Sequence, residues 1–344
     1  MLNQRQRDIL RAVVDDYVST AEPVGSRTLS RKYGLGLSPA TIRNALADLE
    51  DEGLLRQPHT SAGRVPSDQG YRVFVEELMA LSPLEPSVRA DLLRRQAEAD
   101  DLRDLLTQTA RLAAVLSGCT AIVRAPRPAG ARIRALSLVP VTDRDLVLVV
   151  VSSTGAVTHR PITLDEPIAP DEVSALALGL RQHLLDRPLD ALTGRVLESL
   201  AERMGRHRDL IRQVLCRVEA PDDAVVIAQT ANLARQPEFQ QRVDGLLDFL
   251  DRPERVLRWM HEVRSGAPSP GAVSIRIGGE HRDPELQACS VVAASYTIGD
   301  EVAGEVAVLG PTRLDYATAV TAVSVLAAGL SEVFGARLSG EGRQ

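Results

Sequence analysis

The sequence of 344 residues predicts an α+β fold, and three features of its hydrophobic pattern indicate that class. The first third places apolar residues at helical spacing, the middle contains three β-rich runs separated by turn residues, and the last third returns to strands before a final helical run. At this length the chain can form two or three domains with separate cores. Its 44% hydrophobic and 25% charged content is ordinary for a globular protein.

The chain begins with a predicted helix over residues 4–18, followed by a shorter second helix. One stripe of the first helix is apolar and comprises Ile9, Leu10, Val13, Val14, Tyr17 and Val18. The sequence from Glu22 to Ser26 breaks this pattern, and the Ser26 hydroxyl is expected to cap a second helix that runs to Tyr33. The glycine-containing sequence from Gly34 to Leu37 then predicts a turn.

A third helix is predicted to begin after Ser38, whose hydroxyl can accept a hydrogen bond from an unpaired backbone N–H group. Pro39 suits the first helical position, where no N–H is needed. Four apolar residues at helical spacing form the predicted core stripe: Ile42, Ala45, Leu46 and Leu49. The residues expected on the outer surface are Thr41, Arg43, Asn44, Ala47 and Asp48.

Beyond the third helix the sequence predicts a hairpin. Gly53 is expected to end the helix, an apolar strand begins at Leu54, and a polar turn from His59 to Arg64 leads into a second strand. Residues 70–81 are expected to be a strand that passes into a helix. Helix, turn, helix and hairpin in this order indicate a winged helix-turn-helix domain over residues 1–81. In that geometry the third helix lies in the major groove of DNA.

Ten residues of this domain are candidates for DNA contact. Thr41, Arg43 and Asn44 lie in the first turns of the third helix, the end that reaches base edges. An arginine can donate two hydrogen bonds to guanine, and an asparagine can pair with adenine. The hairpin turn and the second helix supply candidates for phosphate or minor-groove contact, namely His59, Thr60, Ser61, Arg64, Arg27, Arg31 and Lys32.

Structural roles are the alternative to DNA contact for some residues of this region. Arg43 could pair with Glu50 or Asp51 in solvent, and Asn44 could be a solvated surface residue. His59 could cap the hairpin turn. Gly63 is expected to serve the hairpin by adopting a positive φ.

Downstream of a hinge at residues 82–86, the pattern predicts a mixed regulatory region. A long amphipathic helix is expected from Ser87 to Gly118. A strand meander is expected over residues 132–141, 145–152 and 156–162, followed by helices over 171–185, 193–218, 237–250 and 253–264, with a short strand over 225–229. The last third predicts strands over 273–277, 289–296 and 304–309 and a closing helix over 313–338.

The charge balance favours DNA binding by placement of cations over binding by net attraction. The formal net charge of the whole chain is −6, whereas residues 1–75 carry ten Arg or Lys and nine Asp or Glu, a balance of +1. One copy of the domain is therefore expected to bind DNA modestly, and dimerisation would strengthen the binding. With only 3% aromatic residues, no stacking surface for single strands is visible, which favours a double-stranded target.

The composition also argues against several other classes of protein. Cys119, Cys216 and Cys289 are far apart and lack metal-ligand spacing, so neither a disulfide framework nor a zinc site is supported. No leader opens the chain, and the apolar tracts 146–151 and 317–330 are expected to be too short for a membrane span. A cytoplasmic location is the expectation.

No catalytic arrangement is evident, so we do not expect an enzyme, a metal or a cofactor. The sequence Gly310-Pro311-Thr312-Arg313 lacks the full spacing of a phosphate-binding loop. A strand-to-helix turn capped by Thr312 explains the same residues.

Three blocks of sequence closely resemble the HrcA family of bacterial heat-inducible transcription repressors. They are SPATIRNALADLEDEGLLRQPHTSAGRVPSDQGYR from Ser38, TANLARQPEF from Thr230 to Phe239, and GEVAVLGPTRLDY from Gly304 to Tyr316. The resemblance spans nearly the whole chain. It implies a winged-helix domain over 1–81, a GAF-like domain over 82–165 and 272–344, and an inserted dimerisation domain over 166–271.

The same resemblance implies a homodimer that binds an inverted-repeat operator upstream of chaperone operons, with activity modulated by the GroEL chaperonin. A different class of function remains open from the residues alone. In that alternative, a GAF-like sensing domain binds a small ligand and gates the winged-helix domain.

Overall fold

The computed structural model describes residues 2–59, 62–81, 83–126, 132–152, 157–164, 166–187, 225–240, 242–265, 271–299 and 301–338. Within this part the chain is a mixed α/β protein, as predicted. It divides into two compact units. Unit 1 comprises Met1–Arg124 and Val226–Gln344, and unit 2 comprises Ala125–Val225.

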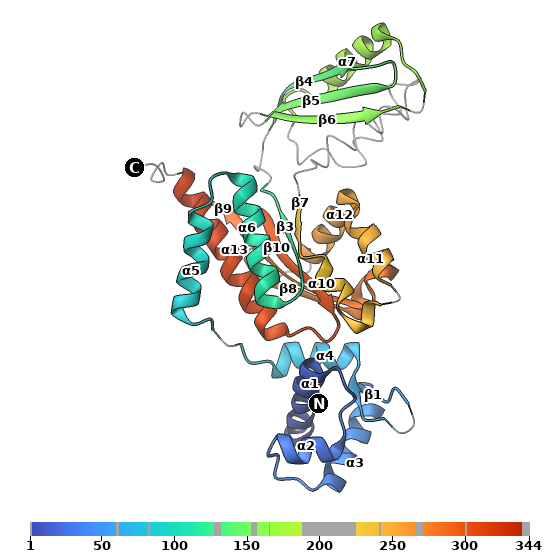
Figure 1. Ribbon diagram of the computed structural model, residues 1–344, viewed down its shortest axis with the longest axis vertical. Coiled ribbons are helices and arrows are strands. Elements are labelled where there is room, and N and C mark those ends of the chain that lie inside the picture. Colours follow the sequence, from blue (N-terminus) through green and yellow to red (C-terminus); the bar gives the residue numbers. More distant parts are fainter. Residues whose placement is uncertain are drawn as a thin grey trace. The chain divides into compact units, whose positions relative to one another are not determined.

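Unit 1 begins with a helical segment that we call the head, residues 3–78 (blue to cyan in Figure 1). Its elements are α1 (Gln4–Thr20), α2 (Ser26–Lys32), α3 (Pro39–Asp51), the two-residue strands β1 (Leu55–Arg56) and β2 (Val65–Pro66), α4 (Asp68–Val73) and the π-helix η1 (Phe74–Leu78). β1 and β2 pair in antiparallel register. The helices of the head enclose a core that includes Ile9, Leu10, Val13, Leu29 and Leu49.

Two predicted details of the head are wrong. The sequence after Gly70 was expected to be a strand passing into a helix, but the chain is already helical from Asp68, because the Ser67 hydroxyl caps α4 by accepting from the Gly70 N–H at 3.0 Å. The second helix is capped at Gly25, and Ser26 is its first residue.

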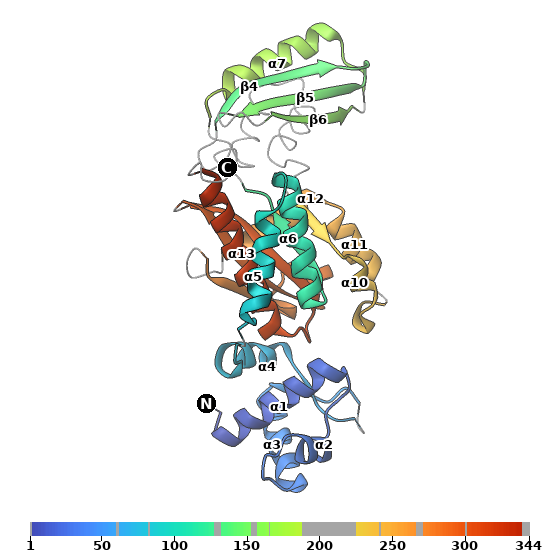
Figure 2. The same ribbon diagram turned by 60° about the vertical axis from the view of Figure 1, so that its left-hand side comes forward.

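The rest of unit 1, which we call the body, is a five-stranded sheet with helices on both faces (Figures 1 and 2). The strand order is β7 (Val225–Ala228), β3 (Thr120–Arg124), β10 (Glu301–Pro311), β9 (Cys289–Ile298) and β8 (Val273–Ile277). α13 (Tyr316–Leu338) packs against one face with α5 (Pro86–Ala97) and α6 (Leu102–Ser117), and α12 (Pro253–Arg264) covers β8 and β9. Eight consecutive residues of β9 are buried, as expected for a strand covered on both faces.

Two helices predicted as continuous are interrupted in the body. The run from Ser87 to Gly118 divides into α5 and α6, because Asp101 starts a new helix by accepting from the Asp104 N–H at 2.8 Å. The run from 237 to 250 divides into a 3₁₀ turn, η5 (Pro237–Phe239), and α11 (Val243–Leu250). Short elements complete the body: α10 (Ala231–Ala234), η6 (Gly278–Glu280) and η7 (Pro284–Leu286).

Unit 2 contains the predicted meander. β4 (Ile133–Pro140), β5 (Asp145–Ser152) and β6 (Val157–Thr163) pair in sequence order, and α7 (Pro170–Leu184) packs against β4. The buried cluster of this unit includes Leu136, Leu148 and Leu180. The helix predicted over 193–218 lies outside the described residues.

The two units divide the chain at other positions than the expected domain limits. β4, β5 and β6 belong to unit 2, although they were expected in the GAF-like domain, and β7, α10, α11 and α12 belong almost wholly to unit 1, although they were expected in the insertion. The three-domain division itself remains a prediction.

The closing helix, α13, begins at Tyr316, three residues later than predicted. Residues 316–336 are long and apolar enough to cross a membrane by length and composition alone, a test that the core helix of a soluble protein also passes. In the structure the helix packs on β9, and Ala319, Val323, Leu326 and Leu330 are buried. It therefore serves as a core helix of the body.

Candidate nucleic-acid interface

The first turn of α3 is fixed by its cap, as predicted. The Ser38 hydroxyl accepts from the Thr41 N–H at 3.1 Å, and Pro39 occupies the first turn. The predicted core stripe is confirmed, because the buried residues of α3 are Ile42, Ala45, Leu46 and Leu49. The opposite surface of the helix therefore faces away from the head core.

That surface carries the first three candidates for DNA contact. Arg43 and Asn44 are exposed, and Thr41 is half-buried with its hydroxyl 2.9 Å from the Ser38 hydroxyl. Within the described part of the chain, Arg43 forms no ion pair. The pairing with Glu50 that competed with a DNA role for Arg43 is made by a different arginine, Arg64.

Arg64 immediately precedes β2, and both its backbone and its side chain are paired. Its backbone pairs with Val24 through N–H···O contacts of 2.9 and 2.8 Å. Its guanidinium lies 2.6 Å from the Glu50 carboxylate of α3, and its side chain is 20% exposed. This placement connects the hairpin to α3 and leaves less of the cation available to DNA than the sequence suggested.

The hairpin turn is described only in part. His59 is exposed and its carbonyl accepts from the Ala62 N–H at 2.8 Å, whereas the candidates Thr60 and Ser61 lie outside the described residues. Gly63 does not adopt the expected positive φ. A Cβ at Gly63 would overlap the backbone of Pro23 and Val24, so this position needs glycine for space.

The three candidates on α2 differ in their surroundings. Arg27 and Arg31 are exposed. Lys32 places its ammonium 2.5 Å from the buried Asp16 carboxylate and 5.5 Å from the centre of the Tyr33 ring. Asp16 would be costly to bury without a cation, so Lys32 also stabilises the packing of α2 against α1.

The second and third blocks that resemble the HrcA family, residues 230–239 and 304–316, contact each other in the body. The sequence had assigned no function to either block. Arg313 donates to the Glu238 carboxylate and, at 2.7 Å, to the Gln236 side-chain oxygen. The turn before α13 is not capped by Thr312. Asp315 accepts from the Thr318 N–H at 3.1 Å, and the guanidinium that resembled part of a phosphate-binding loop is already paired.

The described residues do not indicate a metal site or a reactive thiol. Across the described ranges, no three His, Cys, Asp or Glu side chains are grouped to hold a metal ion. Cys119 and Cys289 are buried free thiols, and burial raises the pKa of Cys119 to about 11 and that of Cys289 to about 12. Cys216 lies outside the described residues.

A family model described as the HrcA protein C-terminal domain matches residues 103–320. The chain is also 38% identical to the heat-inducible transcription repressor HrcA of Moorella thermoacetica, with 96% of this chain and 97% of the relative covered. This chain belongs to the HrcA family of heat-inducible transcription repressors. The HrcA repressor of Kocuria rhizophila is equally similar, at 38% identity over 97% of this chain and all of the relative.

A solved structure of a hypothetical protein has the same fold, with a TM-score of 0.62, 22% identity, and 98% and 99% of the two chains covered. The HrcA relatives are named for a regulatory role that requires no catalysis. The chain is thus a transcription repressor by family, and the exposed N-terminal end of α3 is its candidate DNA-reading surface.

Proposed function

We propose that this HrcA chain represses transcription by binding an inverted-repeat operator as a homodimer, with residues 1–81 acting as a winged helix-turn-helix domain. The observation that carries the proposal is the arrangement of α3. Its apolar stripe is fully buried, while Arg43 and Asn44 are exposed on the turns that reach base edges in this class of domain. The membership of a repressor family supports the same role.

The candidate contacts divide into two kinds. Thr41, Arg43 and Asn44 would read base edges, whereas Arg27, Arg31, His59 and the turn residues Thr60 and Ser61 would hold phosphates. Lys32 and Arg64 would add to phosphate binding less than an unpaired cation does, since each already pairs with a carboxylate. Because the net charge of the head is small, two heads on one operator would supply the affinity that one lacks.

The test is a footprint on a chaperone-operon promoter, followed by titration of the footprinted duplex. Arg43→Ala should weaken cognate binding about 5- to 150-fold, which corresponds to about 1–3 kcal/mol for a lost bidentate base contact. Arg94→Ala, which removes an exposed arginine from α5 of the body, is the matched control. Unchanged cognate binding of the Arg43 variant would rule out the proposed base contact.

The family also suggests the remaining parts of the proposal: a GAF-like body, an inserted dimerisation domain, and modulation by the GroEL chaperonin. Heat-inducible control fits a repressor whose active fraction changes with chaperonin supply, because a few kcal/mol between two states is enough to change occupancy. Operator affinity should rise when purified chaperonin is added. Equal affinity with and without chaperonin would exclude this mode of control.

A ligand-gated regulator is the second candidate, and one cavity favours it. A hollow of about 360 Å³ lies within unit 1, with Arg11 and Asp15 of α1, Met79, and Asp315 beside α13 among its lining residues. A ligand there would contact both the head and the body. A thermal-shift screen with nucleotides and metabolites tests this alternative, which requires a stabilising ligand that also changes operator affinity.

A further inference from the structure

The covalent connection between head and body does not fix their relative orientation. η1 ends at Leu78 and α5 begins at Pro86, and the described residues between them form neither helix nor strand. Each such residue except Pro83, whose ring fixes φ, keeps two soft backbone dihedrals. Any fixed orientation of the head must therefore come from contacts that α4 and its neighbours make with the body.

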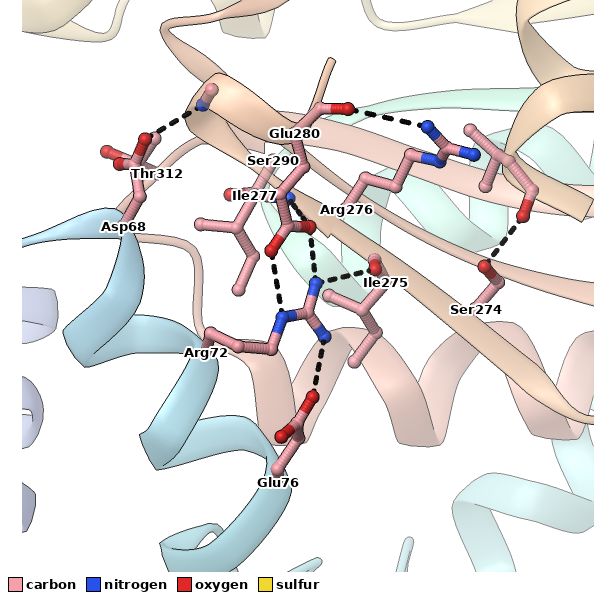
Figure 3. Close-up of polar contacts among 12 residues, drawn as sticks. Asp68, Arg72, Glu76, Ser274, Ile275, Arg276, Ile277, Glu280, Ser290 and Thr312 are labelled. Atoms are coloured by element: carbon pink, nitrogen blue, oxygen red, sulfur yellow. Dashed lines mark hydrogen bonds and ion pairs between the residues drawn. The ribbon is translucent and has the colours of Figure 1, made fainter. Parts of the chain in front are cut away.

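α4 makes such contacts with the edge strand of the body sheet (Figure 3). Asp68 and Arg72 lie four residues apart and share one face of the helix. The Asp68 carboxylate accepts from the Gly279 N–H at 2.8 Å. Arg72 donates through Nε to Glu280 Oε1 at 2.9 Å, through Nη2 to Glu280 Oε2, and through Nη2 to the Ile275 carbonyl at 2.9 Å.

The acceptor side of these contacts is held by the sheet. Ile275 and Ile277 belong to β8, which pairs with β9 from Val273 to Ile277. Glu280 Oε2 also accepts from the Ile277 N–H at 3.0 Å, so the carboxylate that binds Arg72 is attached to the strand. Gly278 adopts φ +51°, and a Cβ at that position would overlap the Asp68 carboxylate. We call these contacts of Asp68 and Arg72 with Ile275, Gly279 and Glu280 the α4 junction.

A buried aromatic pair lies beside the α4 junction. The rings of Tyr71 on α4 and Tyr316 on α13 are 5.8 Å apart at 49°, and both side chains are buried. The Tyr316 hydroxyl donates to the Thr312 carbonyl at 2.7 Å and lies 2.7 Å from the Ser290 hydroxyl. Tyr71 therefore packs against a ring whose hydroxyl is held by two contacts within the body.

The arrangement is more than a single surface ion pair. Isolated exposed pairs contribute little, but a bidentate guanidinium that also binds a strand carbonyl defines an orientation as well as a contact. Arg72 and Glu280 are 208 residues apart in the chain, so the pairing brings distant segments together and does not stabilise a local turn.

We propose that the α4 junction is a positioning device for operator recognition: by fixing each head on its body, it sets the half-site separation that a dimer accepts. This inference rests on the proposed DNA-binding function. Asp68, Arg72, Gly278 and Glu280 are then positioning residues, which act on base recognition through the direction in which α3 points. When the junction is broken, the segment after η1 and the packing of Tyr71 on Tyr316 still connect head and body but no longer fix one orientation, and operators with altered spacing are bound nearly as well as the cognate one.

The experiment compares Arg72→Gln with Arg255→Gln in the full chain. Arg255 is a matched control, because its side chain is 26% exposed, against 27% for Arg72, and pairs with Asp283 inside the body at 2.7 Å. The probes are the footprinted duplex, the same duplex with its half-sites moved apart by two or by four base pairs, and a single half-site.

Arg72→Gln should weaken binding to the cognate duplex at least tenfold, reduce the preference for cognate spacing to less than threefold, and leave half-site affinity unchanged. Arg255→Gln should retain the wild-type spacing preference. Glu280→Gln should reproduce the effect of Arg72→Gln from the body side. The double reversal Arg72→Glu with Glu280→Arg should regain at least part of the preference that either single reversal loses.

Hydrogen exchange provides a readout that does not depend on DNA. The Gly279 amide should exchange faster in Arg72→Gln than in wild type or Arg255→Gln, while the amides of β9 remain protected. If exchange accelerates but spacing preference and cognate affinity stay at wild-type values, or cognate affinity rises, the positioning role is wrong. If the wild-type protein binds neither the operator nor the half-site, the proposed function fails instead.

Discussion

Two surfaces of the head carry arginines at similar helical positions and in opposite states. On α3, Arg43 is exposed and forms no ion pair within the described residues, whereas on α4 Arg72 contacts a carboxylate and a strand carbonyl of the body. The residue type is the same and the net charge of the head is close to zero. Which arginine is available to DNA is therefore decided by where the acidic residues lie.

Arg64 shows the intermediate case. Its sequence position at the end of a polar turn suggested a cation directed at DNA, but the carboxylate of Glu50 lies 2.6 Å away. A guanidinium paired in this way must leave its partner before it can bind phosphate at full strength. The comparison of α3 with α4 thus ranks the candidates, with Arg43 first and Arg64 below it.

Among the variants that test this comparison, Gly278→Ala should have the largest effect on stability, although it changes no charge. The new Cβ requires an unfavourable left-handed backbone and overlaps Asp68, so we expect a loss of about 2–3 kcal/mol in stability together with opening of the α4 junction. Chemical denaturation and exchange of the Gly279 amide measure both effects.

Gly299→Ala is the control for this variant, because Gly299 also has a positive φ, of +62°, but no atom lies within 4 Å of the added Cβ. It should cost about 1–2 kcal/mol from backbone strain and leave the Gly279 amide protected. Equal exchange in the two variants would show that Asp68 does not depend on the glycine.

A lower pH should reduce the stability of the body close to the α4 junction. His281, which follows Glu280, is buried, and its Nδ1 accepts from the Trp259 indole N–H at 3.3 Å. Burial, with a smaller contribution from Arg276, lowers the pKa of His281 to about 4, although Glu280, Asp283 and Asp68 oppose that shift. The unfolded chain takes up a proton below its ordinary pKa of 6.5 and the folded chain does not, so stability falls as pH decreases from 6.5 toward 4.

Between pH 7 and pH 5 this difference amounts to about 2 kcal/mol. Denaturation followed by the fluorescence of Trp259, the single tryptophan, measures it directly. His281→Gln cannot take up the proton but can still accept from the indole, so its stability should depend less on pH by about that amount. Identical pH profiles for the variant and the wild type would show that His281 does not control the acid response.

Arg43→Lys tests whether the exposed arginine of α3 contacts a base or only the phosphate backbone. Lysine keeps the charge but cannot form the bidentate contact with guanine, so we expect about a fivefold loss of discrimination between cognate and mismatched duplexes, about 1 kcal/mol. The salt dependence should stay unchanged because the number of cations is the same. Competition binding at two salt concentrations measures both quantities, and retained discrimination would place Arg43 on the phosphate backbone.

Glu50→Gln should have the smallest effect on operator binding, and it should strengthen that binding. Removal of the carboxylate releases Arg64, so operator binding should tighten two- to threefold, about 0.5 kcal/mol, with a steeper salt dependence. Asp91→Asn, which releases Arg94 on α5, is the matched control and should change neither value. Weaker binding by the Glu50 variant would mean that the ion pair itself holds the hairpin in its binding position.

The sequence was sufficient for structure that depends on near neighbours. The buried stripe of α3 follows from its 3.6-residue periodicity, and α12, β8 and the meander follow from similarly local patterns. The starts of two helices, α4 and α6, were not predicted, although an N-cap residue precedes each of them. Ser67 before α4 and Asp101 before α6 are both N-cap residues, and a search for caps inside long apolar runs would have found them.

The α4 junction could not be predicted in this way. Arg72 and Glu280, like Arg313 and Glu238, are paired by the path of the chain, and no spacing rule connects residues so far apart. Gly63 illustrates the same limit at short range, since the need for space near Val24 arises only once the chain has folded back. The resemblance identified the blocks that contain Arg72, Arg313, Glu238 and Gly63 without indicating what these residues contact, and Glu280 lies outside all three blocks.

The order of strands in the body has a consequence for how this protein can change over evolution. β3 and β7 are hydrogen-bonded neighbours in the five-stranded sheet, although unit 2 separates them in the chain. Unit 2 therefore acts as one long connection between two neighbouring strands of the sheet. The entropic cost of closing such a connection grows only slowly with its length. Insertions, deletions or replacement of that whole module can accumulate without shifting the register of any strand in the sheet.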